Sequence, residues 1–461
     1  MAAVLLAASA IAGFRGEDWF NIERGARSLT DLPATLLAHD TPGFYRPLPD
    51  LLTGALNRMF GLRPWPYLAT LLALLALDVA LLAAIVRARG GSRAAAWIAV
   101  AALAVQCNAY AWTVFWFSYV TGSLVTTFLL LAIWLHHRAV ARAGSGGSVG
   151  PWIAGAAIAL ALAALCKEEV VLLPLILAAL EAARWRRLTP AERRGAVVSF
   201  AALSLVVAAY AVFRWTVHPP SPGEGSAQYR LAFGRNWVSN LVFFGFHLLP
   251  LPVAMAVFAW IEARHRDSQP APSSPVREEL RAGAAWTLLS IQLYLPMGGH
   301  AYGLLYLPAF GVALGLAPWL ATGLHPARRL ALYGGLAVLA TAWGLAGAGW
   351  HRYRAIAHAT FATLDQASPS PPPGARFVFL DPMERETLSG RSLFNMTFDG
   401  AAASMVRLHY RRSDLDARMV VGPAALDSAV HPPVATAVFL VRGGHLERVD
   451  RGAQVAKRPV R

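Results

Sequence analysis

Two adjacent carboxylic acids, Glu17 and Asp18, stand where the first apolar run of the sequence ends. The aromatic pair Trp19-Phe20 and a long polar loop follow them. A carboxylate at a membrane boundary can take a proton from a hydroxyl or amine nucleophile, because a low dielectric raises its pKa. Its oxygens can also hold a divalent cation, Mg²⁺ or Mn²⁺, against a phosphate. The alternative is a pair of solvated acids flanking a membrane span.

Cationic residues recur in two short stretches further along. Tyr45-Arg46 lies in the same polar loop, and the planar fork of an arginine suits phosphate oxygens. An arginine that snorkels to the membrane interface is the alternative for Arg46. Lys167-Glu168-Glu169 places three charges between two apolar runs with almost no loop. Charges at membrane depth are paired or functional, so this triplet is either a structural ion pair or part of a site.

Two weaker clusters complete the set of candidates. Arg230 and Arg235 lie among aromatic residues in one polar loop, where a plain solvated loop is an equally good interpretation. His300 is followed by Tyr302 and Tyr306, and a lone histidine in such a place is more often a hydrogen-bonded packing residue than a ligand.

The composition indicates a membrane protein. Of the 461 residues, 56% are hydrophobic and 15% are charged, whereas soluble domains carry about 25% charged residues. Repeated apolar runs have the length that crosses a bilayer, and backbone pairing in lipid requires them to be helices. The net charge of +15 sits mostly in short loops, as the positive-inside rule expects, which argues against a nucleic-acid partner. We therefore predict an all-α polytopic membrane protein.

The apolar runs predict about eleven transmembrane helices. They cover residues 1–14, 64–86, 94–112, 118–135, 151–166, 170–183, 195–213, 236–261, 282–297, 303–322 and 329–349. Every second loop between these runs is rich in arginine, so all the arginine-rich loops lie on one side of the membrane. The positive-inside rule assigns that side to the cytoplasm. All the candidate residues named above then share the extracytoplasmic face. Asp78, inside an apolar run, is expected to pair with a residue of a neighbouring helix.

The chain divides into a membrane part and a soluble tail. Residues 1–350 form the membrane domain, and its first extracytoplasmic loop, 15–63, contains short interfacial helices separated by proline breakers at Pro47 and Pro49. A Pro-rich linker, 351–374, leads to a small α/β extracytoplasmic domain, 375–461. Strand-like runs in the tail lie at 376–381, 417–421 and 435–441.

Acids and cations on one membrane face suit an enzyme that receives a lipid-linked phosphate and transfers what the phosphate carries. At these residues the chain resembles the GT-C superfamily of glycosyltransferases that use polyprenyl-phosphate sugars. The likeness is to protein O-mannosyltransferases and to bacterial relatives of the transmembrane tetratricopeptide mannosyltransferases, without the repeats. The elements that carry it are, in order, Glu17-Asp18, Tyr45-Arg46-Pro47-Leu48, Lys167-Glu168 with Leu172-Leu173-Pro174-Leu175, and Tyr306-Leu307-Pro308.

The resemblance implies a GT-C-like fold in the bacterial inner membrane, with inverting transfer of a sugar such as mannose to a protein, lipid or glycan acceptor outside the cytoplasm. Asp18 is then expected to be the general base, supported by Glu17, and the pair to hold any divalent cation. Donor-phosphate contacts are expected from Arg46, Lys167, Tyr45, Arg230 and Arg235, with Glu168 orienting Lys167 and with His300, Tyr302 and Tyr306 in support. A transporter or flippase of a lipid-linked saccharide and a non-catalytic membrane scaffold are the rival hypotheses. The first of these is weakened because no internal repeat is found.

Overall fold

The computed structural model of the chain describes residues 13–37, 45–106, 109–110, 113, 116–217, 234–250, 252–253, 257, 274–297, 302–323, 334, 351–382, 393–398, 400–422, 437–442 and 445–449. The predicted span 1–14 and nearly all of the predicted span 329–349 lie outside these residues.

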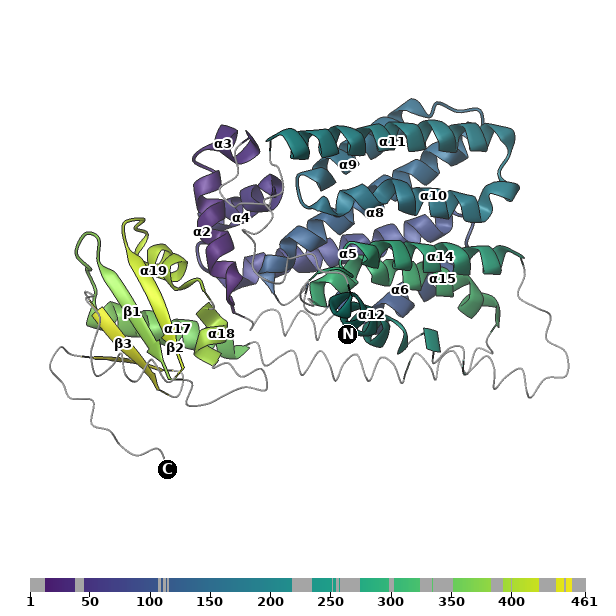
Figure 1. Ribbon diagram of the computed structural model, residues 1–461. Coiled ribbons are helices and arrows are strands. Elements are labelled where there is room, and N and C mark those ends of the chain that lie inside the picture. Colours follow the sequence, from purple (N-terminus) through teal and green to yellow (C-terminus); the bar gives the residue numbers. More distant parts are fainter. Residues whose placement is uncertain are drawn as a thin grey trace.

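A bundle of helices forms the membrane part, and its helices share one apolar core (Figure 1). Each predicted span within the described residues lies on one of these helices. They are α5 (Pro64–Ala88), α6 (Arg93–Val105), α8 (Val120–Gly144), α9 (Gly150–Ala164), α10 (Leu173–Arg184), α11 (Pro190–Val217), α12 (Arg235–Leu248), α14 (Ser274–Gln292) and α15 (Tyr306–Gly323).

The chain is a polytopic membrane protein. Within the described part, four helical stretches are long and apolar enough to cross a bilayer, namely Pro64–Ala88, Phe117–Gly144, Pro190–Val217 and Gly303–Ala321. The apolar helices α6 and α9 are shorter. The count of eleven spans is therefore not confirmed.

Three helices occupy the first loop, namely α2 (Glu17–Ser28), α3 (Leu32–Leu37) and α4 (Pro47–Phe60). The acid pair begins the first turn of α2. Pro47 and Pro49, which were expected to break helices, instead lie in the first turn of α4. Proline is tolerated there because the first N–H groups of a helix have no partner within it.

Helices α2 and α4 pack in close contact at two glycines. A Cβ atom on Gly54 would lie 2.2 Å from the carbonyl oxygen of Gly25. One turn away, the Arg24 guanidinium binds the buried Asp50 carboxylate at 2.7 Å. The contact fixes the helix that carries the acid pair against the helix that begins beside Arg46.

Replacing Gly54 with alanine will lower the Tm, although alanine is the better helix former. Alanine gains about 0.5–1 kcal/mol over glycine within a helix, but the added methyl overlaps the backbone at Gly25, and such overpacking costs about 1–3 kcal/mol. Gly122→Ala on α8 is the matched control, since nothing lies within 4 Å of its Cβ position. The control is expected to keep or raise the Tm; equal Tm values for the two variants would contradict the close contact.

In the described part of the tail, four strands form a sheet of order β2-β1-β3-β4. The first strand, β1 (Arg376–Asp381), is parallel to β2 (Asp416–Val421) and to β3 (Ala437–Arg442), and β4 (His445–Arg448) is antiparallel to β3. The three expected strands are thus confirmed.

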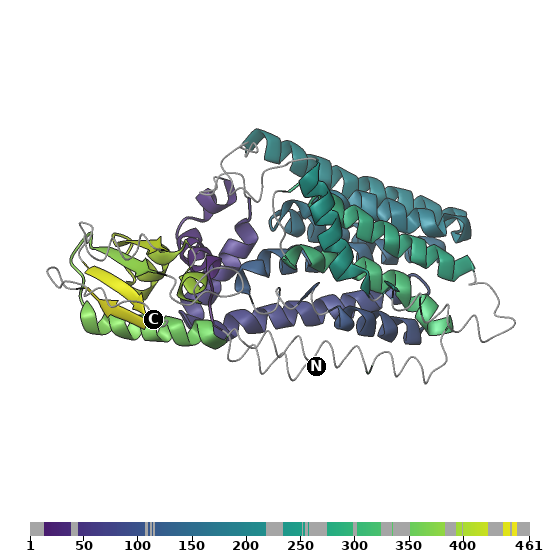
Figure 2. The ribbon, with the colours of Figure 1, turned by 60° about the horizontal axis from the view of Figure 1, so that its bottom comes forward.

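Helices cover this sheet. They are α17 (His351–Ala367), α18 (Leu393–Phe398) and α19 (Ala402–Tyr410). Most of the segment expected as a Pro-rich linker, 351–374, is the helix α17, which Figure 2 shows running along the sheet toward the bundle. The proline run, 369–373, follows the end of this helix.

The tail packs directly against the start of α2. The backbone N–H of Gly16 and the indole N–H of Trp19 both donate to the carbonyl oxygen of Thr397, at 2.8 and 2.9 Å. The Trp19 ring, 1% exposed, lies between Phe361 of α17 and Phe398 of α18. The acid pair is therefore held between the bundle and the tail.

Candidate functional site

The first feature of the site is the buried carboxylate of Asp18, which is 1% exposed. One oxygen, Oδ1, accepts hydrogen bonds from the backbone N–H and the hydroxyl of Ser118, both at 2.7 Å. The other, Oδ2, accepts from the backbone N–H of Arg15 at 2.9 Å. Ser118 belongs to the 3₁₀ turn η1 (Phe117–Tyr119) that leads into α8. Asp18 thus ties the start of α2 to the start of a transmembrane helix.

Glu17 has the opposite environment. It is exposed and is the first residue of α2, where the positive end of the helix dipole favours an acid. The two neighbouring carboxylates therefore differ sharply in burial: Asp18 is buried among hydrogen-bond donors and Glu17 is exposed.

Burial raises the pKa of Asp18 to about 7, against the hydrogen bonds from Ser118 and Arg15, which lower it. Because the ordinary value is 3.8, the folded protein binds this proton more tightly than the unfolded chain. The contribution of this bound proton to the free energy of unfolding is therefore fully present below about pH 4 and is lost as the pH rises through about 7.

The Tm difference between wild type and Asp18→Asn will consequently be larger near pH 5 than near pH 8. The asparagine amide also places its N–H₂ group against the donors of Ser118 or Arg15, where no hydrogen bond can form. The variant is therefore the less stable protein at both pH 5 and pH 8. Thermal melts of the two proteins across this range measure the effect. A difference that does not change with pH would contradict the raised pKa.

A divalent cation at Glu17-Asp18 stays a prediction. A carboxylate offers about four lone-pair positions, and three of those on Asp18 accept N–H or O–H groups. Within the described ranges, three potential ligands come together at His136, His137 and Glu181 instead. The guanidinium of Arg184 already binds both oxygens of Glu181 there.

The second feature is a cationic cluster at the junction of α9 and α10. The Lys167 ammonium contacts Oε1 of Glu169, which also accepts the hydroxyl of Tyr294. Lys167 lies 5.6 Å from the centre of the Tyr294 ring. The glutamate and the tyrosine thus fix the lysine from two sides.

A second cation joins this cluster from the end of α11. The Arg214 guanidinium lies 3.7 Å from Oε1 of Glu168. Glu168, which was expected to orient Lys167, therefore faces Arg214, and Glu169 is the partner of the lysine. Lys167 is extended and a 3₁₀ turn, η2 (Glu168–Leu172), follows it, so the two glutamates point in different directions. One of them then meets Tyr294 and the other meets Arg214.

The loop before α4 brings Tyr45 and Arg46 to the same place. The Leu48 N–H donates to the carbonyl oxygen of Leu165 at 3.1 Å, two residues before Lys167. The Tyr45 ring packs edge-on against Phe213, 5.2 Å between centres, next to Arg214. The charge of the half-buried Arg46 acts on the phenol of Tyr294. Three cations from three segments of the chain therefore each lie near Tyr294 or Tyr45.

Of the remaining residues predicted for phosphate binding or its support, Tyr306 has a described side chain, and it lies elsewhere. Tyr306 donates its hydroxyl to the buried Asp78 of α5 at 2.7 Å, which confirms an interhelical partner for Asp78. Arg230 and His300 lie outside the described residues. Arg235 and Tyr302 begin α12 and the turn η5 (Tyr302–Leu305), and their side chains are not described.

Sequence reasoning missed three residues of the site, Ser118, Arg214 and Tyr294, and it named Glu169 only as one of the three charges at 167–169. One signal was available for Tyr294, since Tyr294-Leu295-Pro296 repeats the triplet Tyr306-Leu307-Pro308. Arg214 was visible only as one arginine of a polar loop, and Ser118 has no local mark of its role.

No protein-family model matches the chain, and no curated protein matches its sequence. The fold is similar to two crystal structures of ArnT from Cupriavidus metallidurans. The structure bound to undecaprenyl phosphate has a TM-score of 0.53 and 14% identity, covering 96% of this chain and 95% of that one. The apo structure has a TM-score of 0.56 and 13% identity, covering 95% and 90%. The chain therefore shares its fold with ArnT.

Proposed function

We propose that the chain is an integral membrane glycosyltransferase that moves a sugar from a polyprenyl-phosphate donor to an acceptor at the extracytoplasmic face. The observation that carries the proposal is the group of cations Arg46, Lys167 and Arg214 at the end of the bundle where α2 presents its acids. A fold shared with a protein that was crystallised with undecaprenyl phosphate supports the same conclusion.

The cations have a defined task in such a transfer. The acceptor oxygen or nitrogen forms a bond to the anomeric carbon from one side, and the bond between that carbon and the phosphate oxygen breaks on the other. The polyprenyl phosphate leaves with the electron pair, so its charge grows during the step. Arginine and lysine donors aimed at this phosphate stabilise the transition state more than the ground state.

An acid must take the proton of the acceptor, and the geometry favours an exchange of the roles expected from the sequence. Glu17 is exposed in the first turn of α2. Asp18 is buried, and both of its oxygens are engaged. We therefore propose that Glu17 takes the proton of the acceptor and that Asp18 holds α2 in position.

The test is release of polyprenyl phosphate by the purified protein in liposomes, using a panel of polyprenyl-phosphate sugars headed by the mannose donor. Membrane and protein extracts serve as the source of acceptor. We expect release that needs both the donor and the extract, and that falls strongly in Arg46→Gln and Arg214→Gln. Movement of intact donor between leaflets without release would favour a flippase. If no donor of the panel gives release or movement, the non-catalytic scaffold is the favoured hypothesis.

A further inference from the structure

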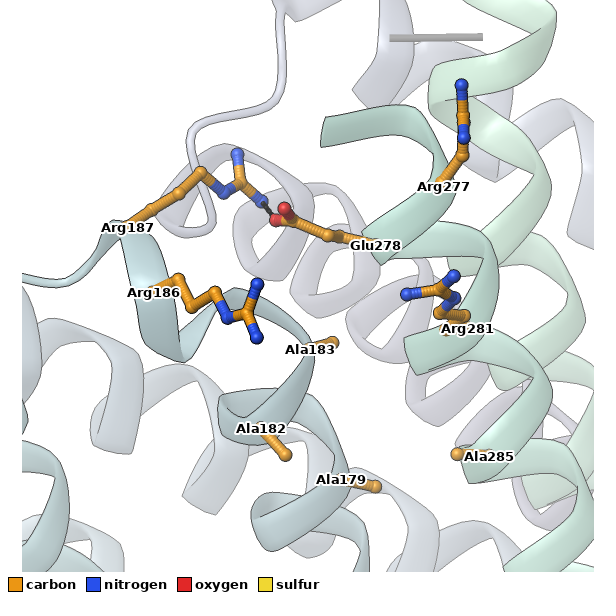
Figure 3. Close-up of a pocket in the computed structure, with 9 residues that line it drawn as sticks. All are labelled: Ala179, Ala182, Ala183, Arg186, Arg187, Arg277, Glu278, Arg281 and Ala285. Carbon is orange, nitrogen blue, oxygen red and sulfur yellow. Dashed lines mark ion pairs between the residues drawn. The ribbon is translucent and has the colours of Figure 1, made fainter. Parts of the chain in front are cut away.

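A basic cavity lies at the other end of α10, away from the acid pair and the lysine. It has a volume of about 850 Å³ and lies between α14 and the end of α10 with the turn η3 (Trp185–Arg187). Its charged lining residues are Arg186, Arg187, Arg277, Glu278 and Arg281. Alanines of α10 and α14 line the rest of it, as Figure 3 shows.

The cavity has a strong excess of positive charge. Four arginines face one glutamate, and that glutamate already binds Arg187 at 2.5 Å. In Figure 3 the guanidinium groups of Arg186 and Arg281 extend toward the same space from opposite walls. Neither of these two has a carboxylate within ion-pair distance among the described residues. Two guanidinium forks aimed at one space fit the oxygens of a phosphate ester.

An apolar groove adjoins the basic cavity on the α11 side of the same helix. Its volume is about 470 Å³, and its walls include Trp185, Val197 and Phe200. The two cavities share Ala182 and Arg186. A cationic space beside an apolar groove matches a molecule with a phosphate head and a hydrocarbon chain, whereas a free phosphate would need the cationic space alone.

We propose that this paired cavity binds an anionic phospholipid, with the headgroup phosphate between Arg186 and Arg281 and an acyl chain along Trp185 and Phe200. Basic pockets between transmembrane helices on the cytoplasmic side are suited to anionic headgroups, and the positive-inside rule assigns this arginine-rich end to the cytoplasm.

The site is separate from the proposed donor site and does not depend on the proposed function. Lys167 precedes α10 and the cavity lies at its end, so the 12-residue helix, about 18 Å long, separates them.

Bound lipid would stabilise the arginine-rich end of the bundle. Glu279, beside Glu278 on α14, binds Arg89 at the end of α5 at 2.9 Å, and Arg89 also donates to the Leu180 carbonyl oxygen of α10. A headgroup between α10 and α14 therefore closes a set of contacts that already joins three helices. Melting temperature is thus a suitable measure of binding.

The experiment titrates the purified full chain in neutral detergent with phosphatidylglycerol and follows the Tm. We expect a saturable rise with phosphatidylglycerol, little with phosphatidylcholine, and little with sodium phosphate at the same phosphate concentration. The double variant R186Q/R281Q should raise the apparent Kd by about tenfold to a hundredfold, since it removes two charge-assisted contacts. Its matched control is R93Q/R194Q, which removes two exposed arginines outside both cavities and should leave the Kd unchanged.

A third variant keeps the charge and blocks the space. Ala182→Leu fills the junction of the two cavities at an exposed helical position, where leucine is a good helix former, and should weaken lipid binding at least threefold. An unchanged Kd in both R186Q/R281Q and A182L would overturn the proposal. So would an equal loss in the R93Q/R194Q control, or a full Tm rise with sodium phosphate alone.

Discussion

Glutamine in place of Glu17 will lower the rate of sugar transfer by about two to four orders of magnitude, the usual contribution of a general base. The substitution removes the proton acceptor but keeps the size of the side chain. Glu17 is exposed and begins α2, so the Tm should stay close to that of wild type. The measurement is the initial rate of polyprenyl phosphate release at saturating donor, together with a thermal melt of each protein.

Asp18→Asn is the matched control for this variant, since it makes the same chemical change one residue further on. It should lower the Tm, because the hydrogen bonds from Ser118 and Arg15 meet an amide in place of a carboxylate. Any loss of rate should then follow the loss of structure. If E17Q keeps at least half of the wild-type rate while a folded D18N is inactive, Asp18 is the base, as the sequence alone suggested.

The second large effect is expected at Lys167. Methionine at this position removes the proposed donor-phosphate contact and leaves the carboxylate of Glu169, with a side chain 6% exposed, without its cation. Breaking a buried pair by removing one partner costs about 3–5 kcal/mol. We therefore expect Lys167→Met to lower both the Tm and the affinity for polyprenyl phosphate, the latter by about tenfold or more.

The double variant K167M/E169Q separates these two effects. Glutamine still accepts the Tyr294 hydroxyl but carries no charge, so most of the Tm should return. The affinity for undecaprenyl phosphate, measured by titration of the detergent-solubilised protein, should stay low. Recovery of affinity together with stability would show that Lys167 has a structural role only.

Local patterns in the sequence determined the elements. Apolar runs predicted helices such as α5 and α11, because backbone groups in lipid must pair within their own segment. The runs at 376–381 and 417–421 likewise became β1 and β2. The basic and acidic candidates Glu17, Asp18, Arg46 and Lys167 were also visible, since charges beside apolar runs stand out in so hydrophobic a chain.

The burial and the partners of those charged residues depend on the tertiary structure alone. Asp18 is the buried acid of its pair because Ser118, 100 positions away, supplies two donors. Lys167 takes Glu169 because Tyr294 fixes that carboxylate, while Glu168 meets Arg214 from another helix. In the sequence, the arginines around the cavity beside α10 only indicated which loops are cytoplasmic. The structure shows that those at the end of α10 and those of α14 line one cavity. A sequence states which side chains are present, but burial, hydrogen bonds and charge pairing depend on partners that only the folded chain brings within reach.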